Sequence, residues 1–458
     1  MKLIKNLTII SVIILLCITG CSKSENNSIN NVTDVDNISE ENVTAMENAS
    51  TVENTTTDEI AVIDNGEVNN YGYIIPELNI TSKDIPDTEA MSFAQDMRIG
   101  WNLGNTFDSS VEMPWFEDEL GYETAWCGVE TTPEIIKAVK NAGFNTIRIP
   151  VSWHNHVNFD YENFIISEEW LNRVKEVVDY AIELDMYVII NTHHDIMPGN
   201  MDGVQSDCFI YPTEECYATS ERYITAIWQQ LCETFKDYDE KLIFESMNEP
   251  RLTYTNYEWW LDPNSVECQE AVSCINKLNQ CFVNVVRNSG GNNSERYLLI
   301  PGYCSSFDGA MNEGFVLPED TIADKLMVVV HAYTPYNFAL QAQTDGGSKS
   351  TFDVNNTEDT KEIDYIMNAL YEKYISNGIP VIIDEFGARN KKSDDGTDNI
   401  QARINFTAYY VAVARASGII CCWWDNNSFN SEGEDFGLLN RAGLMWQYAD
   451  IVQAMMKY

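Results

Sequence analysis

Positive charge is scarce in this chain. Its 458 residues include 28 Lys and Arg against 71 Asp and Glu, which gives a net charge of −43. Nucleic acid and an anionic membrane surface would both repel such a protein, so we expect neither as a partner. A neutral polysaccharide is compatible with this charge, although the charge alone does not indicate one.

Two short motifs are also missing. No glycine-rich phosphate-binding loop follows any of the apolar runs, which excludes the nucleotide-binding α/β folds. No CxxC pair occurs among the 12 cysteines. Cys421 and Cys422 lie in an apolar run and are predicted to be packed thiols. A disulfide between Cys208 and Cys216 is left open, because an anaerobic source would keep both reduced.

The apolar run nearest the N-terminus, residues 7–18, is too short to span a bilayer as a stable helix. It follows two lysines, and the small residue Gly20 stands between it and Cys21. Residues 1–20 are therefore predicted to be a bacterial lipoprotein signal peptide. Cys21 would then be lipidated, and the protein would be an extracellular, cell-surface lipoprotein that meets the membrane only through this anchor. A plain signal peptide with an incidental cysteine is the alternative.

Residues 21–85 are predicted to be a disordered linker. They are rich in Asn, Thr, Ser, Asp and Glu, and they contain few aromatic residues before Tyr71. Such a segment cannot bury enough apolar surface to offset the entropy lost on ordering. Residues 71–80 are more apolar and could dock on the folded domain, which we expect to comprise residues 86–458.

Eight apolar runs in this domain predict eight β-strands. Their spacing averages about 46 residues, which suits strands that alternate with helices and loops. Helical patterns lie between them, for example at residues 170–184 and 221–235. This order favours an α/β fold of the (β/α)8 TIM-barrel type over an open sheet. The runs centre near Trp101, Arg148, Ile190, Glu245, Leu299, Val329, Ile382 and Cys422.

Two of these strands end in carboxylates. Residues 242–250, LIFESMNEP, place Asn248 and Glu249 after a short apolar run, and residues 380–388, PVIIDEFGA, place Asp384 and Glu385 likewise. One such glutamate would usually be a solvated loop residue. Two carboxylates delivered by two strand ends suit glycoside hydrolysis, in which one protonates the leaving oxygen and the other attacks or activates water.

All five histidines fall at or just past the predicted carboxyl ends of strands, the catalytic face of such a barrel. A metal site formed by His193, His194 and Asp195 is the alternative interpretation. Adjacent side chains of a strand point to opposite faces, so a pair of neighbouring histidines does not by itself form a chelate. We therefore expect no metal and no other cofactor. The five are His154, His156, His193, His194 and His331.

Seven motifs in sequence order give the chain a family resemblance. They are GWNLGNTFD at 100–108, RIPVSW at 148–153, NTHHD at 191–195, NEP at 248–250, HAYTPY at 331–336, DEFG at 384–387 and WWDNN at 423–427. From about Phe93 to the C-terminus the chain resembles glycoside hydrolase family 5, and within it the bacterial endo-β-1,4-glucanase (cellulase) branch. The resemblance implies a (β/α)8 catalytic domain.

The resemblance assigns Glu249 as the catalytic acid/base and Glu385 as the nucleophile of a retaining mechanism. Glu249 would start protonated and Glu385 ionised. Arg148 would hold Glu385 in its charged form, because a nearby cation lowers the pKa of a carboxylate. His331 and Tyr333 are two residues apart on the sixth strand, so both would face the site, Tyr333 toward Glu385 and His331 toward the substrate or Glu249.

The same resemblance implies a set of substrate contacts. Asn248 would bind the sugar 2-hydroxyl, and Trp424 would be the platform under the sugar at the cleavage point, whereas Trp423 would face away. The full set is Asn105, Arg148, His193, His194, Asn248, His331, Tyr333 and Trp424. Sugar stacking and core packing both remain open for four loop tryptophans, Trp115, Trp126, Trp259 and Trp260. Asn427 replaces a glycine that is common in the family's eighth-strand motif, which puts the loop geometry there in doubt.

The resemblance to the endoglucanase branch implies an endo-acting hydrolase of β-1,4-glucan, and we expect a polysaccharide as partner and a monomeric state. Xyloglucan, mixed-linkage glucan, xylan and β-mannan remain alternative substrates, because subsite loops decide between them. A non-catalytic carbohydrate-binding lipoprotein is the alternative of another class. Such a protein would keep its tryptophans but would need neither glutamate.

Overall fold

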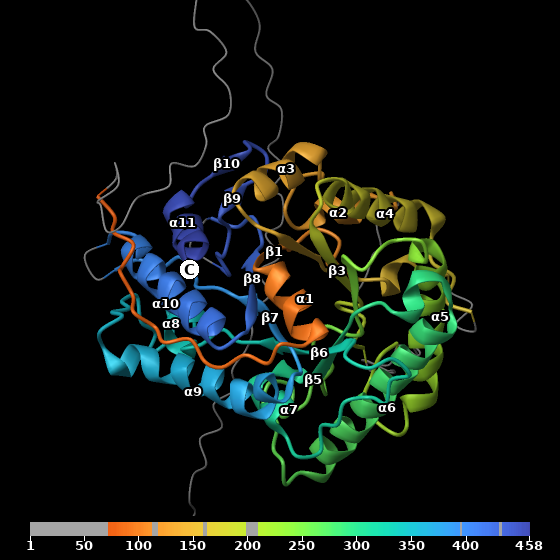
Figure 1. Ribbon diagram of the computed structural model, residues 1–458. Coiled ribbons are helices and arrows are strands. Elements are labelled where there is room, and N and C mark those ends of the chain that lie inside the picture. Colours follow the sequence, from red (N-terminus) through yellow and green to blue (C-terminus); the bar gives the residue numbers. More distant parts are fainter. Residues whose placement is uncertain (1–71, 112–117, 159–162, 198–208, 394–395, 430–432) are drawn as a thin grey trace, which may run out of the picture. The chain divides into compact units, whose positions relative to one another are not determined.

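The computed structural model describes residues 72–458 except 112–117, 159–162, 198–208, 394–395 and 430–432 (Figure 1). The predicted signal peptide, Cys21 and most of the predicted linker lie outside the described residues, as do Trp115 and Cys208. Within the described part of the chain, no helix combines the length and the apolar character needed to cross a membrane.

Eight parallel strands form a closed barrel in sequence order, which confirms the predicted fold class. Every predicted strand centre falls inside an observed strand. The strands are β1 (Ile99–Leu103), β2 (Thr146–Ile149), β3 (Tyr187–Asn191), β4 (Leu242–Glu245), β5 (Leu298–Ser306), β6 (Leu326–His331), β7 (Val381–Phe386) and β8 (Ile420–Asp425). A short antiparallel pair, β9 (Leu439–Asn440) and β10 (Met445–Trp446), follows β8. Cys421 and Cys422 are buried in β8, as predicted.

Helices surround the barrel (Figure 1). Two of the longer helices, α4 and α6, begin with serine caps: Ser167 accepts a hydrogen bond from the Trp170 N–H group, and Ser265 accepts one from that of Cys268. The helices are α1 (Glu89–Met97), α2 (Gly121–Ala125), α3 (Pro133–Asn141), α4 (Glu168–Glu183), α5 (Tyr217–Phe235), α6 (Val266–Asn288), α7 (Phe307–Met311), α8 (Tyr336–Ala339), α9 (Thr357–Lys373), α10 (Ile400–Ala416) and α11 (Ala449–Lys457). Three 3-10 turns cover His154–His156, Gly291–Ser294 and Ile375–Asn377.

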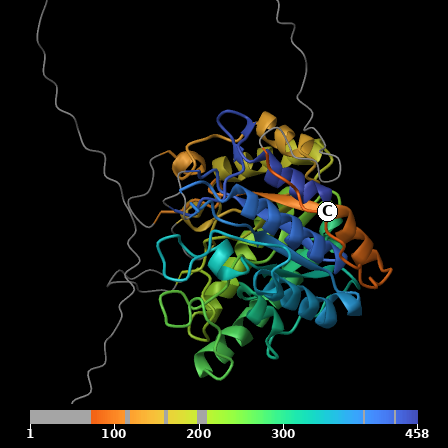
Figure 2. The ribbon, with the colours of Figure 1, turned by 90° about the vertical axis from the view of Figure 1, so that its left-hand side faces the viewer.

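Helix α1 closes the amino-terminal end of the barrel. Its Phe93 ring stacks on Tyr297 with 3.6 Å between centroids and meets Tyr187 edge-on. Phe93 and Met97 belong to the same buried cluster as the inward-facing residues of the strands, such as Ile243. Figure 2 shows α1 at one end of the barrel and long connecting loops at the other. The apolar interior therefore ends below the catalytic face, where polar side chains take over.

An extended segment before α1, residues 72–86, packs against the domain along α10. The Ile74 N–H group donates to Gln401 near the start of that helix (2.9 Å), and the Lys83 N–H group donates to the Ala416 carbonyl at its end (2.8 Å). Ile75 is buried. The predicted linker boundary at residue 85 is therefore wrong, because this stretch has enough apolar surface to dock, as its more apolar composition suggested.

Truncation tests this boundary. A variant that begins at residue 72 should unfold at the temperature of the full chain. One that begins at residue 86 should lose roughly 2–4 kcal/mol of unfolding free energy, because the burial of Ile75 and its apolar neighbours is lost. Denaturant unfolding of the two variants measures the difference. Equal stability would show that residues 72–85 contribute nothing to the fold.

Candidate active site

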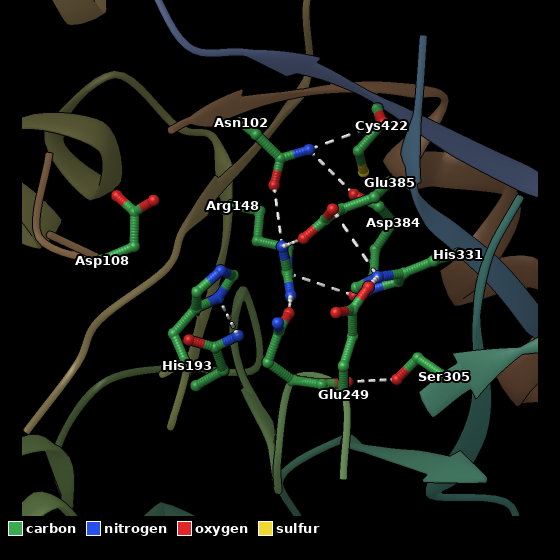
Figure 3. A network of polar contacts seen from close by, with 12 residues as sticks. Asn102, Asp108, Arg148, His193, Glu249, Ser305, His331, Asp384, Glu385 and Cys422 are labelled. Atoms are coloured by element: carbon green, nitrogen blue, oxygen red, sulfur yellow. Dashed lines mark hydrogen bonds and ion pairs between the residues drawn. The ribbon is translucent and has the colours of Figure 1, made fainter. Parts of the chain in front are cut away.

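The two predicted catalytic glutamates meet at the carboxyl end of the barrel. Glu385 lies in β7, and Glu249 lies four residues past β4. One carboxylate oxygen of each, together with a ring nitrogen of His331, lies within 4.8 Å of the others. Figure 3 shows the two carboxylates pointing toward each other beside that ring. Retaining glycosidases hold their carboxyl groups about 5–5.5 Å apart, whereas inverting enzymes need about 6.5–9.5 Å to lodge a water.

Arg148 connects the two strands that deliver these glutamates. Its guanidinium is buried and donates to Glu385 at 2.7 Å, to both oxygens of Glu245 at 2.7 and 2.8 Å, and to the Asn248 Oδ1 atom at 2.7 Å. Asp384 Oδ2 lies 3.1 Å from Arg148 Nε. The predicted contact between Arg148 and Glu385 is thus confirmed. Glu245 and Asp384 were not predicted as site residues, although a carboxylate within each buried apolar run was the available signal.

Glu245 and Asp384, two carboxylates that contact Arg148, differ in their pKa values. Burial raises the pKa of Glu245 to about 7, against the opposing charge of Arg148, and Asp384 raises it further. Burial also acts to raise the pKa of Asp384, but the charges of Arg148 and His331 outweigh it and leave that pKa lowered. Glu245 is therefore the carboxyl of this pair that takes up a proton first as the pH falls.

His331 lies between the catalytic glutamates and Asp384. Its Nδ1 atom is 2.8 Å from Glu249 Oε1, and its Nε2 atom is 3.3 Å from Asp384 Oδ1. Burial lowers the pKa of His331, but Glu385 and Asp384 more than offset this and raise it well above its ordinary value. The ring therefore carries a positive charge in the free site. Its predicted approach to Glu249 is confirmed.

Tyr333 donates its phenolic hydrogen to Glu385 Oε2 at 3.0 Å, as predicted. It does so from a loop, because β6 ends at His331. The side-chain alternation used to place it on the strand therefore does not apply, although the predicted contact holds. Glu385 thus has Arg148 on one carboxylate oxygen and Tyr333 on the other.

The charge state of the two glutamates in the free site differs from our prediction. Burial acts to raise the pKa of Glu249, but the hydrogen bond and charge of His331 and the charge of Arg251 outweigh it and lower that pKa to about 2. Burial raises the pKa of Glu385 despite His331 and Arg148. The expected order is therefore reversed, because the acid proton rests on His331 while the carboxyl that would donate it is ionised.

His193 and His194 lie on the other side of the site. The His193 ring is parallel to Trp424 with 5.9 Å between centroids, and the His194 ring meets that of His193 edge-on at 4.5 Å. Both rings therefore reach one region, because β3 ends at Asn191 and strand alternation no longer separates them. Burial lowers the pKa of His193 well below its usual value and that of His194 to about 4, so both are neutral at pH 7.

Asp108 is the one carboxylate that approaches both histidines closely enough to join them around a cation, with ligand atoms within 4.8 Å, among the residues that the structure describes. Its oxygens already accept the N–H groups of Asn105 at 3.0 Å and Thr106 at 2.6 Å. These bonds hold Asn105 in a left-handed turn with φ of 56°. The absence of a metal requirement stays a prediction.

Comparison with known proteins identifies the family. The family described as Cellulase (glycosyl hydrolase family 5) matches residues 110–430. The chain belongs to glycosyl hydrolase family 5. It is 38% identical over 370 residues to Endoglucanase A of Clostridium longisporum. This match covers 80% of this chain and 65% of that protein. It is 40% identical over 375 residues to Endoglucanase 1 of Ruminococcus albus, covering 81% of this chain and 82% of that protein.

A solved structure extends the likeness to the fold. It is the complex of cellotetraose with a mutant of the glycoside hydrolase 5 lichenase from Caldicellulosiruptor sp. F32. That chain is 54% identical, with a TM-score of 0.79 over 84% of this chain and 99% of its own. The barrel that positions the two glutamates is therefore similar to the fold of a solved family 5 enzyme.

One family 5 motif departs from its common form at Asn427. This residue has a φ of 54°, in the left-handed region that favours glycine and that asparagine tolerates best among other residues. Its N–H group donates to Asp425 at 2.9 Å, and its Oδ1 atom accepts from the Arg441 N–H group at 3.1 Å. The turn thus keeps a glycine-like backbone, and the doubt about its geometry is removed.

The tryptophans separate into core and surface groups. Trp423 is buried and donates to the Phe436 carbonyl at 2.9 Å, facing away from Trp424 as predicted. Three loop tryptophans are exposed: Trp126 by 43%, Trp259 by 52% and Trp260 by 76%. The Trp259 ring packs against the guanidinium of Arg251, 4.1 Å away, and Arg251 itself contacts Glu249. Core packing is thus excluded for these three.

The proton on His331 should set the basic limit of catalysis. Because its pKa is raised, the imidazole keeps its proton below that pKa and loses it as pH rises through it. His331→Gln removes this proton store, so the basic limb of kcat/KM should move toward lower pH by about one unit or more. Profiles on a substrate with a poor leaving group measure the shift.

A substrate with an activated leaving group is the control, because its first step needs no acid. Its basic limb should move much less in the same variant. Identical basic limbs for the wild type and His331→Gln on the poor leaving group would contradict the proton-store interpretation.

Proposed function

We propose that this protein is a retaining, endo-acting hydrolase of β-1,4-glucan. The observation that carries the proposal is the close approach of Glu249 and Glu385, within 4.8 Å, at the carboxyl end of a closed barrel. This spacing leaves no room for an intervening water and suits direct attack by one carboxylate. The endoglucanase names of the two relatives described above support β-glucan as the substrate class.

In the first step, Glu385 attacks the anomeric carbon while the bond to the leaving oxygen breaks. Arg148 and Tyr333 hold one carboxylate oxygen each and orient the nucleophile. Glu249 supplies the proton to the leaving oxygen. Because that proton rests on His331 in the free site, it crosses the 2.8 Å hydrogen bond to Glu249 before or during this step. The product is a covalent glycosyl-enzyme intermediate.

In the second step, Glu249 accepts a proton from water, which attacks the anomeric carbon and releases Glu385. Two displacements retain the anomeric configuration. Asn248 supports both steps, because its Oδ1 atom is occupied by Arg148 and its amide NH₂ group is left to donate to the sugar 2-hydroxyl. The parallel rings of His193 and Trp424 offer a flat wall to a sugar ring.

Mixed-linkage glucan is the second candidate substrate. The observation that favours it is the likeness to the Caldicellulosiruptor lichenase, which is 54% identical to this chain. Both substrates would be cleaved by the same two glutamates. The difference lies in the loops that bind sugars away from the cleavage point, where Trp126, Trp259 and Trp260 are exposed.

We also propose that the enzyme acts at the cell surface. The support is the sequence of residues 1–21, which has the lysines, the short apolar run and the cysteine of a lipoprotein signal. A polymeric substrate cannot enter a cell, so a surface location matches the proposed activity.

The division of labour between the glutamates is tested by rescue. Glu385→Gln should abolish turnover and leave substrate binding intact. Glu249→Ala should still form the glycosyl-enzyme from substrates with good leaving groups, and azide should restore turnover by yielding a β-glycosyl azide, because only the second step then lacks its base. Proton NMR of the first-formed sugar should show the β-anomer, and an α-anomer would contradict the nucleophile assignment.

Endo cleavage is tested by viscosity. The viscosity of a soluble cellulose derivative should fall faster than reducing ends appear, because internal cuts shorten long chains most. Parallel reducing-sugar assays on mixed-linkage glucan, xyloglucan, xylan and β-mannan rank the substrates. Release of a single short product from chain ends would overturn the endo assignment.

The anchor is tested by fractionation. Cys21→Ser should move the protein from the membrane fraction to a soluble fraction or the medium, because the lipid is the expected membrane contact. Unchanged membrane association of the variant would remove Cys21 from this role.

A further inference from the structure

The carboxyl end of β5 contains two successive residues in a conformation that L-amino acids rarely adopt. Cys304 has a φ of 56° and Ser305 a φ of 44°. The pairing of β5 with β6 shifts register between Pro301 and Ser306, which marks a bulge at this point. Such strain persists only where the surrounding structure enforces it, and bulges of this kind often re-aim side chains at a barrel rim.

Helix α7 enforces the bulge by packing directly on β5. A Cβ atom on Gly309 would lie 2.2 Å from the Tyr303 carbonyl oxygen, and one on Gly302 would lie 2.8 Å from the Gly309 carbonyl carbon. Only glycines allow this approach. Ser306 then caps α7, because its hydroxyl accepts from the Gly309 N–H group at 2.9 Å and donates to the Tyr303 carbonyl at 2.9 Å.

The bulge turns three successive residues toward the segment that carries Glu249. The Ser305 hydroxyl donates to the Asn248 carbonyl, and the Cys304 N–H group donates to the Pro250 carbonyl at 2.8 Å. The Tyr303 hydroxyl accepts the Leu252 N–H group at 3.1 Å. Residues 303–305 therefore hold the backbone of residues 248–252, and Figure 3 shows the contact that Ser305 makes.

We propose that Ser305 is a positioning residue for the catalytic acid/base. The Asn248 carbonyl and the Glu249 N–H group belong to one rigid peptide plane, so a bond that fixes the carbonyl also fixes the direction in which Glu249 leaves the chain. The preceding peptide is held by the residue that follows β3, because the Asn248 N–H group donates to the Thr192 carbonyl at 2.9 Å. Ser305 is fully buried and supplies the matching hold from β5. This role rests on the proposed function of Glu249.

The inference is tested by removing the hydroxyl in two ways. Ser305→Ala removes it and leaves the strained backbone, whereas Ser305→Gly removes it and suits the positive φ. Ser306→Ala is the matched control, because among the described residues the hydroxyl of this neighbouring serine bonds only Tyr303 and Gly309 and contacts none of residues 248–252. A loss shared by both Ser305 variants and absent from the control therefore belongs to the hydroxyl and not to backbone strain.

The kinetic readout is leaving-group dependence on aryl β-cellobiosides. Both Ser305 variants should lose about 10-fold or more in kcat/KM on poor leaving groups and much less on good ones, because misplacement of the acid affects only the former. Ser306→Ala should keep the wild-type dependence. A Ser305 variant with the wild-type dependence would overturn the proposal, even if it unfolds at a lower temperature.

Hydrogen exchange separates this inference from the proposed function. The amides of Asn248, Glu249, Arg251 and Leu252 should exchange faster in both Ser305 variants than in the wild type and in Ser306→Ala. A wild-type protein that cleaves no β-glucan would sink the proposed function alone. Unchanged exchange in the Ser305 variants would show that the hydroxyl does not hold this segment.

Discussion

The active site depends on the burial of one guanidinium, that of Arg148, inside the mouth of the barrel. A buried charge without partners is prohibitively unstable, so the cation requires carboxylates around it. Glu245 and Asp384 supply them from below and Glu385 from above. Removing one partner of such a cluster costs about 3–5 kcal/mol. The same bonds that keep the barrel mouth stable therefore fix Glu385, the proposed nucleophile, in place.

The carboxylates that surround Arg148 give the site an excess of negative charge, which protons or cations must compensate. Four carboxylates crowd around Arg148 and His331, namely Glu245, Glu249, Asp384 and Glu385. Like charges at this distance cannot all ionise unless protons or cations compensate. Burial raises the pKa of Glu245 to about 7, which weakens its negative charge near neutral pH, and the neighbouring carboxylates keep His331 cationic. In the proposed mechanism, Glu249 receives its proton from His331, which the surrounding carboxylates keep protonated.

The sequence was sufficient for the barrel and for the two glutamates, because apolar runs and the carboxylates at their ends are local signals. It was insufficient for Glu245, whose role arises from its contact with Arg148, which lies two strands away in the barrel and 97 residues away in the sequence. The orientation of His194 and the loop position of Tyr333 depended on where each strand stops, which is set by pairing and not by pattern. The charge of Glu249 could not be predicted, because it depends on the distance to His331 and on burial.

The rigid barrel also explains where strain is placed. Backbone conformations that cost free energy survive when packed elements on both sides enforce them. At the end of β5, the close contact of Gly302 and Gly309 with their neighbours enforces the left-handed conformation of Cys304 and Ser305. In this conformation the Ser305 hydroxyl binds the segment that carries Glu249. A strand end without this strain would point the Ser305 hydroxyl elsewhere. The packing of α7 on β5 therefore accounts both for the distortion of β5 and for the proposed positioning of Glu249.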